Sequence, residues 1–384
     1  MISLFCESVV SLAGSLSSLT RSLFCVFVLL FSLRSYNRQS RGCSACWVKV
    51  REHQNSQRRG GGVGGGAILW AAAAAFSLFR SEEDERDEAQ RKEDEMILLL
   101  KKAKLNLHRG HHQAASSFLH QAVVLAHQTH NTNAIVYTYS LMANLAYVQG
   151  ELDSAEKLFK AAMSFMLSNG TPLDDNAVIE MSLKLTTIYA EQSKAELAEQ
   201  GFRFCVESLE SKLEKDTSGD EQTEEQEVLR KDTRLLLGLC LDSRARYRAS
   251  TRNLKQAEED YKRALDICTQ EQGETHPQTL VLMSDLATIL DLQGHHGDAL
   301  VLVQRAVDLS RSAGHPDQHV LLGNMAGILL HKGQLDEAVH FYQEALRLAR
   351  QNHDQEAVDQ IQEGLREVTR RRRSQEEEEG GSDE

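Results

Sequence analysis

The chain has 384 residues and a formal net charge of −13, and only 3 of its residues are proline. Residues 1–80 carry nine Lys and Arg residues against two acidic ones, a local charge of +7, which leaves −20 for residues 81–384. Nucleic-acid binding requires a basic surface that neutralises phosphates, so the acidic body argues against nucleic acid as a partner. The scarcity of proline and the abundance of Ala and Leu favour helices.

The first segment, residues 1–66, is rich in Ser and Arg and poor in acidic residues. That composition is typical of a mitochondrial transit peptide, and we predict that the segment is disordered. The apolar run Ser22–Ser32 leaves a second interpretation open, because it resembles the apolar region of a secretory signal. The third interpretation is a cytosolic chain that retains the whole segment.

Residues 67–79 form an apolar run of thirteen residues. A helix of this length spans about 20 Å, which is less than the roughly 30 Å hydrocarbon core of a bilayer. We therefore expect either a sorting segment or a short membrane anchor, and the alternative is a weakly apolar helix in a leader that is removed. Arginines precede the run and acidic residues 82–85 follow it. The positive-inside rule then keeps the amino end in the mitochondrial matrix and directs the rest of the chain to the intermembrane space.

An acidic linker is predicted over residues 80–95, which are charge-dense and lack apolar periodicity. Residues 96–369 then repeat one pattern, in which two helices are joined by a short turn and a small residue recurs in the second helix. These small residues are Ala115, Ala155, Ala198, Ala257, Ala299 and Ala338, with spacings of 40, 43, 59, 42 and 39. Six hairpins at a near-constant period predict an all-α solenoid.

The clearest copies of the hairpin lie in Leu280–Arg350. In each copy a turn glycine, Gly294 or Gly333, precedes the alanine of the second helix by five residues. Glycine accepts the positive φ that a tight turn requires, because it has no Cβ. Alanine allows two helices to approach closely, because a larger side chain would hold their axes apart. The two residue types therefore mark the turn and the packing surface of each hairpin.

The longest spacing contains an acidic insertion at residues 214–227. We interpret it either as a solvated loop or as an overlong helix, and the functional alternative is a docking element for a basic partner. Three arginines on the next helix, Arg244, Arg246 and Arg248, are expected to pair with it.

Two segments end the chain. Residues 353–369 are predicted to form a helix that covers the exposed apolar face of the last repeat. Residues 370–384 contain four arginines followed by a run of glutamates, and this composition predicts a disordered charged tail.

Signatures of catalysis such as GxSxG, HExxH and GxxxxGK[ST] are absent from the sequence. Histidines gather in residues 108–130 and invite a metal hypothesis, but His111 and His112 recur as His295 and His296 in a later turn. That recurrence indicates polar turn residues rather than ligands. We therefore predict no metal, no cofactor and no enzymatic activity.

The hairpins resemble the tetratricopeptide repeat family, and the turn of Gly273, His276 and Pro277 resembles the one that precedes each extended repeat of kinesin light chains. The resemblance implies a right-handed superhelical solenoid of about six hairpins plus a C-terminal capping helix. It also implies a partner-binding groove lined by fixed positions of the first helices. On this chain those positions are Tyr137, Ser140, Asn144, Tyr147, Thr187, Ser284, Thr288, Asp291, Val320 and Gly323.

One branch of this family clamps a carboxylate with Lys and Asn. Asn144 matches that pattern, but Ser140 stands where the clamp needs Lys. Binding of a chaperone tail is therefore not expected for this chain.

A closer resemblance covers about residues 95–368. The blocks Tyr137–Leu167, Asp175–Gln192, Leu235–Tyr247 and Gly273–Gly294 are similar, in order and spacing, to mitochondrial members of the family that serve respiratory complex III. The resemblance implies a non-enzymatic protein-binding scaffold at the inner membrane, with complex III subunits including the Rieske iron–sulfur protein as partners. It implies a role in assembly and maintenance of the complex, through handling of that subunit and clearance of its fragments. The alternative is a cytosolic adaptor of kinesin-light-chain type that binds cargo peptides.

Overall fold

The computed structural model describes residues 88–215 and 224–380. The predicted transit peptide and the apolar run lie outside the described residues, as do positions 216–223 of the acidic insertion and the last four residues. Within the described part, the secondary structure consists of thirteen helices, α4 to α16, without any strand. The prediction of an all-α fold is confirmed.

Twelve of these helices pair into the six predicted hairpins. The first three hairpins are α4 (Glu88–His108) with α5 (His112–Gln128), α6 (Thr132–Val148) with α7 (Leu152–Ser168), and α8 (Asn176–Glu191) with α9 (Ala195–Lys215). The next three are α10 (Glu224–Ser250) with α11 (Leu254–Gln272), α12 (Pro277–Leu292) with α13 (His296–Ala313), and α14 (Gln318–His331) with α15 (Leu335–Gln351). The last helix, α16 (Gln355–Gly380), packs against α15 and against α14, so it caps the sixth hairpin as predicted.

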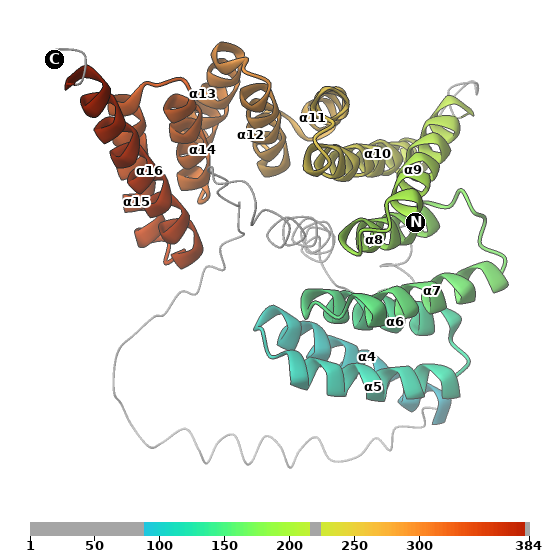
Figure 1. Cartoon of the computed structure of the whole chain (residues 1–384). Helices are drawn as coiled ribbons and strands as arrows, with labels where there is room; N and C mark the ends of the chain where they lie inside the picture. The colour runs from blue at the N-terminus through green and yellow to red at the C-terminus, as the bar shows by residue number, and fades with distance from the viewer. Residues whose placement is uncertain (1–87, 216–223, 381–384) are drawn as a thin grey trace, which may run out of the picture.

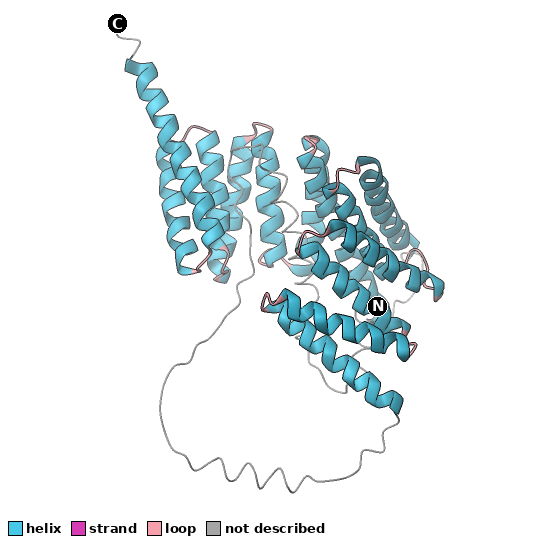
Figure 2. Ribbon diagram, turned by 60° about the horizontal axis from the view of Figure 1, so that its bottom comes forward, coloured by secondary structure: helices cyan, strands magenta, loops and turns pink. Residues whose placement is uncertain are grey.

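The hairpins stack side by side into a curved solenoid (Figures 1 and 2). Each helix packs against the helices that precede and follow it in the chain. The first helices also contact one another between neighbouring hairpins, α8 with α10 and α12 with α14. In Figure 1, α8, α10 and α14 lie toward the inside of the curve and α9, α11 and α13 lie on its outside. We call the surface formed by the first helices α6, α8, α10, α12 and α14 the inner face.

Close packing of helices at small residues holds each hairpin together. All six predicted alanines are fully buried: Ala115, Ala155, Ala198, Ala257, Ala299 and Ala338. Seven residues later each second helix buries another small side chain: Ala122, Ala162, Cys205, Ala264, Ala306 and Ala345. Helix axes come this close only where the side chains between them are small.

The turns keep one backbone conformation whether or not they contain glycine. Gly294 and Gly333 have φ of 84° and 85°. The third and fourth hairpins lack this glycine, and Ser193 and Arg252 adopt the left-handed conformation there with φ of 59° and 62°. A side chain with a Cβ is disfavoured in that region by about 1 kcal/mol. The geometry of the turn is therefore set by the packing of the two helices.

The first described helix begins earlier than the sequence pattern predicts. α4 starts at Glu88, so residues 88–95 of the predicted linker are helical. Lys92 Nζ lies 2.8 Å from Glu88 Oε1, one turn away, and such pairs stabilise a helix that has no apolar periodicity. Further along, Leu98 and Leu105 are 51% and 47% exposed, so α4 presents apolar side chains at this end of the stack.

The capping helix is also longer than predicted. α16 continues through the residues expected to form a disordered tail and ends at Gly380. Arg371 Nη1 donates to the carbonyl oxygen of Leu330 at 3.0 Å, and Arg372 binds Asp336. The arginine run is therefore held against the last hairpin by charged contacts, which a search for apolar periodicity does not detect.

A tight contact fixes the capping helix and can be tested. Gly364 of α16 lies against the buried ring of Tyr342, and a Cβ at position 364 would lie 2.5 Å from Tyr342 Cζ. Gly364→Ala should therefore force α16 away from α15 and lower the free energy of unfolding by about 1–3 kcal/mol. The measurement is the thermal midpoint by circular dichroism.

The matched control is Gly297→Ala on α13, where nothing lies within 4 Å of an added Cβ. Alanine at an unstrained helical position is neutral or slightly stabilising. Equal thermal midpoints for the two variants would show that α16 does not pack against Tyr342 of α15 this closely.

Candidate functional site

Four of the predicted groove positions lie on one side of α6. Tyr137, Ser140, Asn144 and Tyr147 are three or four residues apart, which places them along one face of the helix. The side chain of Asn131 caps the amino end and fixes where the helix begins. Tyr137 and Ser140 are partly exposed, whereas Asn144 and Tyr147 are buried.

Tyr147 connects three of the inner helices. Its hydroxyl donates to Glu191 Oε1 at the end of α8. Burial of the phenol, and then the negative charge of Glu191, raises the pKa of Tyr147, while the positive charge of Arg246 on α10 acts in the opposite direction. The phenol therefore stays protonated at physiological pH and remains a hydrogen-bond donor.

Asn144 lies one turn before Tyr147 and is 5% exposed. Its Oδ1 has no hydrogen-bond partner among the described residues. A buried polar group without a partner costs about 1–3 kcal/mol, and most such groups in proteins are paired. The described residues therefore provide no donor for the buried side-chain oxygen of Asn144.

Two carboxylates of the inner face lie near a single guanidinium group. Asp242 of α10 is 1% exposed and binds Arg246 on the same helix. Burial raises the pKa of Asp285 on α12 to about 7; the charge of Arg246 opposes this rise and the charge of Asp242 adds to it. Among the described residues, Asp285 has no hydrogen bond or ion pair.

These side chains come from α6, α8, α10 and α12, and therefore from four successive hairpins. We call the set Asn144, Tyr147, Glu191, Asp242, Arg246 and Asp285 the polar centre. It combines hydrogen-bonding groups with carboxylates on the inner face, which suits recognition of a polar or charged side chain.

Most of the polar centre was not among the predicted positions. Only Asn144 and Tyr147 had been predicted, because the prediction used the groove positions of the family and did not consider which charged residues lie near one another. A sequence signal does exist: Asp285 lies between Leu282 and Leu286 of α12, and both leucines are buried. A charge within such a helix indicates either a partner in another repeat or a ligand.

Two predicted positions join the fifth and sixth hairpins. Ser284 Oγ accepts a hydrogen bond from Asn324 Nδ2 of α14 at 2.8 Å. Asp291 contacts His296 Nδ1 at 2.7 Å and also His331 Nδ1 of α14. Both residues therefore have structural partners across the interface between the hairpins.

The remaining predicted positions are used within their own helices. The hydroxyls of Thr187 and Thr288 donate to backbone carbonyls one turn earlier, at 3.0 and 2.9 Å. Val320 and Gly323 are buried in α14. Of the predicted positions, Asn144 and Tyr147 thus belong to the polar centre, whereas Ser284 and Asp291 are bonded to residues of α14.

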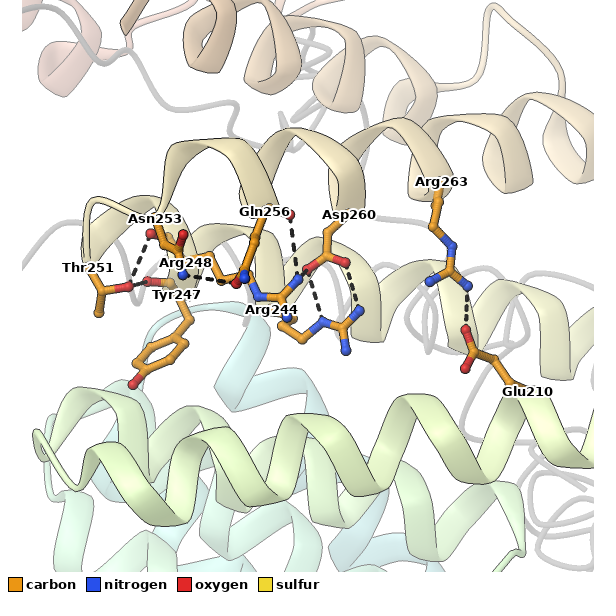
Figure 3. Close-up of polar contacts among 9 residues, drawn as sticks. All are labelled: Glu210, Arg244, Tyr247, Arg248, Thr251, Asn253, Gln256, Asp260 and Arg263. Carbon is orange, nitrogen blue, oxygen red and sulfur yellow. Dashed lines mark hydrogen bonds and ion pairs between the residues drawn. The ribbon is translucent and has the colours of Figure 1, made fainter. Parts of the chain in front are cut away.

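The sequence predicted that Arg244, Arg246 and Arg248 pair with the acidic insertion, but among the described residues their partners lie elsewhere, and Arg246 binds Asp242 of its own helix. Arg244 and Arg248 both bind Asp260 of α11, with N–O distances of 2.7 and 2.6 Å (Figure 3). They are one turn apart, so they project from the same side of α10 toward α11. The carboxyl end of the insertion pairs instead with Arg234, whose Nη2 lies 2.7 Å from Glu227 Oε1.

Among the described residues, no three His, Cys, Asp or Glu side chains are placed to hold a metal ion. The part of the chain that the structure describes also has no helix with the length and apolar character needed to cross a membrane. Cys205, Cys240 and Cys268 are free thiols, and all three are buried. Burial raises the pKa of Cys268 to about 12, so this thiol does not ionise at physiological pH.

Family models described as tetratricopeptide repeat match residues 233–312 and 321–362, and one described as anaphase-promoting complex subunit 5 matches residues 77–149. Two curated relatives are described as tetratricopeptide repeat protein 19, mitochondrial. The Danio rerio protein is 65% identical over 71% of this chain and 67% of its own length. The Rattus norvegicus protein is 44% identical over 71% of this chain and 74% of its own length.

The chain belongs to the tetratricopeptide repeat protein 19 family. The family name and the repeats make it a mitochondrial tetratricopeptide repeat scaffold. A solved structure, the apo form of RapI, superimposes with a TM-score of 0.55 at 11% identity, over 77% of this chain and 74% of that one. At that identity the likeness concerns the fold alone, and it agrees with the curved stack of hairpins.

The buried ion cluster between α10 and α11 predicts a large effect of a single substitution. Asp260 is 2% exposed and binds both Arg244 and Arg248, so Asp260→Asn leaves two guanidinium groups without their anion. Breaking one side of a buried ion pair typically costs 3–5 kcal/mol, and these partly exposed arginines should give about 2–4 kcal/mol. Urea denaturation measures the loss, with the exposed Asp266→Asn on the same helix as control.

Substitution of Asp285 should change the free energy of unfolding in the opposite direction. Its folded-state pKa of about 7 lies above the ordinary value of 3.8, so the folded state binds the extra proton between these pH values. Ionisation of Asp285 therefore lowers stability as pH rises from about 4 to 7, and the penalty is complete above that range. Asp285→Asn should raise the free energy of unfolding by about 2–4 kcal/mol at pH 8 and by much less at pH 4.5.

Urea denaturation of the two proteins at both pH values measures this difference. Asp266→Asn, which removes an exposed carboxylate, should change neither result. A loss of stability in Asp285→Asn at pH 8 would show that its charge has a stabilising partner.

Proposed function

We propose that the chain is a non-enzymatic scaffold of the mitochondrial inner membrane that binds subunits of respiratory complex III, including the Rieske iron–sulfur subunit. In this role it serves assembly and maintenance of the complex by handling that subunit and by clearing its fragments. The proposal extends the resemblance of the hairpin blocks to mitochondrial proteins of this role.

The observation that carries the proposal is membership of a mitochondrial family whose similarity covers 71% of this chain. The described chain consists of stacked hairpins, and such solenoids act by presenting an extended surface to other proteins. Mitochondrial relatives favour this function over the cytosolic cargo adaptor, which would act in another compartment.

The polar centre suits holding a segment rather than cutting it. Its members supply carboxylates, an amide, a phenol and a guanidinium, but no Ser or Cys beside a His. Clearance of fragments by this surface is therefore displacement from the complex or presentation to a protease. Binding across four hairpins places the energy of recognition in a few buried anchors, as in other protein interfaces.

Affinity purification tests this function. Tagged full-length chain is recovered from mitochondria solubilised in mild detergent, and its partners are identified by mass spectrometry. We expect cytochrome b, cytochrome c1, the core subunits and the Rieske subunit in near-stoichiometric amounts, because a maintenance factor must contact the assembled complex.

The control is the same purification from mitochondria that contain the untagged chain. Recovery of cytosolic cargo or motor proteins without respiratory subunits would replace this proposal with the adaptor function. Recovery of subunits of a different respiratory complex would contradict the assignment to complex III.

A further inference from the structure

One side of α4 combines exposed leucines with cations. Four exposed residues lie within about 100° of the helix circumference: Leu98, Lys101, Lys102 and Leu105. Arg109 continues this side into the turn, because its N–H still bonds to the carbonyl oxygen of Leu105 at 3.1 Å. We call these five residues the basic face. It lies opposite the apolar residues that α4 buries in the core of the first hairpin.

The cations of the basic face are not neutralised by the described protein. Residues 96–150 contain four Lys and Arg residues and no Asp or Glu, although the chain as a whole is acidic. Among the described residues, Lys101, Lys102 and Arg109 form no ion pair. The Nζ of Lys102 lies 5.8 Å from the centroid of the Phe118 ring instead. The acidic side chains of α4 all precede Met96, so this face carries a positive charge that the described structure leaves unbalanced.

The leucines of this face are exposed because α4 is the first helix of the stack. It packs mainly against α5, so no described hairpin covers its other side. Leu98 and Leu105 are two helical turns apart, with the two lysines between them. Such a pattern suits the boundary of a lipid bilayer, where leucines enter the interfacial region and lysines extend to the phosphate groups.

The position of α4 in the chain favours the same partner. Only residues 80–87 separate this helix from the apolar run 67–79, which the sequence predicts to be a sorting segment or a membrane anchor. Eight residues span at most about 29 Å when fully extended. If the apolar run enters a bilayer, the first hairpin must therefore stay close to the surface of that bilayer.

We propose that the basic face rests on an anionic lipid bilayer, with Leu98 and Leu105 in its interfacial region and the three cations against lipid phosphates. This inference rests on the proposed location at the inner membrane, and it adds a surface through which the repeats themselves contact that membrane. The first hairpin then lies at the lipid surface, and the later hairpins extend from it (Figure 2).

Two other anionic partners fit less well. A nucleic acid needs a long basic footprint, and the described chain is acidic beyond the first two hairpins. An acidic protein would attract the cations, but lysine is depleted in protein interfaces relative to the rest of the surface. Neither partner accounts for leucines and lysines on the same side of one helix as directly as a lipid surface does.

Labelling of lysines tests the proposal at the residues concerned. Full-length chain reacts with a water-soluble N-hydroxysuccinimide ester in the presence of vesicles, and labelled peptides are quantified by mass spectrometry. Vesicles of phosphatidylcholine with phosphatidylglycerol should lower labelling of Lys101 and Lys102 at least about threefold relative to phosphatidylcholine alone, because the amines then lie among lipid phosphates. Labelling of Lys255, which is exposed on α11, should not change.

A double variant separates this contact from binding by other parts of the chain. In Leu98→Asp with Leu105→Asp, anionic vesicles should no longer protect the two lysines, because the new carboxylates are repelled by the lipid surface. The matched control is Val301→Asp, which changes an exposed apolar side chain of α13 and should behave like the native chain. Circular dichroism shows that each variant is folded. Added salt should also restore labelling in the native chain, since it screens the attraction.

Four results would overturn the proposal. Two of them are equal labelling with both kinds of vesicle and protection that persists in the double variant. The third is low labelling before vesicles are added, which would show that another segment of the chain covers the basic face. The fourth is protection by purified complex III but not by anionic vesicles, which would assign the face to a protein partner.

The vesicles contain no protein, so this outcome is separate from that of the affinity purification. Unprotected lysines with complex III still recovered would leave the scaffold function in place and remove only the lipid contact. Protected lysines without recovery of respiratory subunits would keep the lipid contact and contradict only the assignment to complex III.

Discussion

The structure depends on the close approach of paired helices at buried small residues. Each hairpin has two such positions in its second helix, as in Ala299 and Ala306, and both are fully buried. This contact sets the distance between the helices and therefore how one hairpin stacks on the next. Because the same contact recurs six times, the first helices line up along one side of a curve. The inner face follows from the packing of the hairpins.

The hairpins could be predicted from the sequence because their determinants are local and repeat. A turn residue and an alanine five positions later are visible without any knowledge of the fold, as for Gly294 and Ala299. The ends of the outer helices could not be predicted in that way. The last turns of α16 are held by a hydrogen bond from Arg371 to the carbonyl oxygen of Leu330, a residue of the sixth hairpin. Such long-range contacts leave no periodic trace in the sequence.

The candidate site shows the same division. The family positions on α6 identified Asn144 and Tyr147. Asp242 and Asp285 were not identified, because their charges interact only once folding has brought α10 and α12 together. Ser284 and Asp291, which the family positions also include, have bonding partners within the protein. What separates the two groups is whether a buried polar atom is satisfied. That property depends on the three-dimensional arrangement of several repeats.

The two ends of the stack differ, and the difference limits how copies of the chain can associate. Helical stacks grow into filaments when each end is complementary to the other. Here α16 covers one end and is fastened to the last hairpin through Arg371 and Arg372, while α4 presents Leu98 and Leu105 at the other. Among the described residues, the end formed by α4 presents apolar side chains, and the end formed by α16 is closed by polar contacts. The two described ends are therefore not complementary to each other, and their surfaces do not favour head-to-tail growth of the stack.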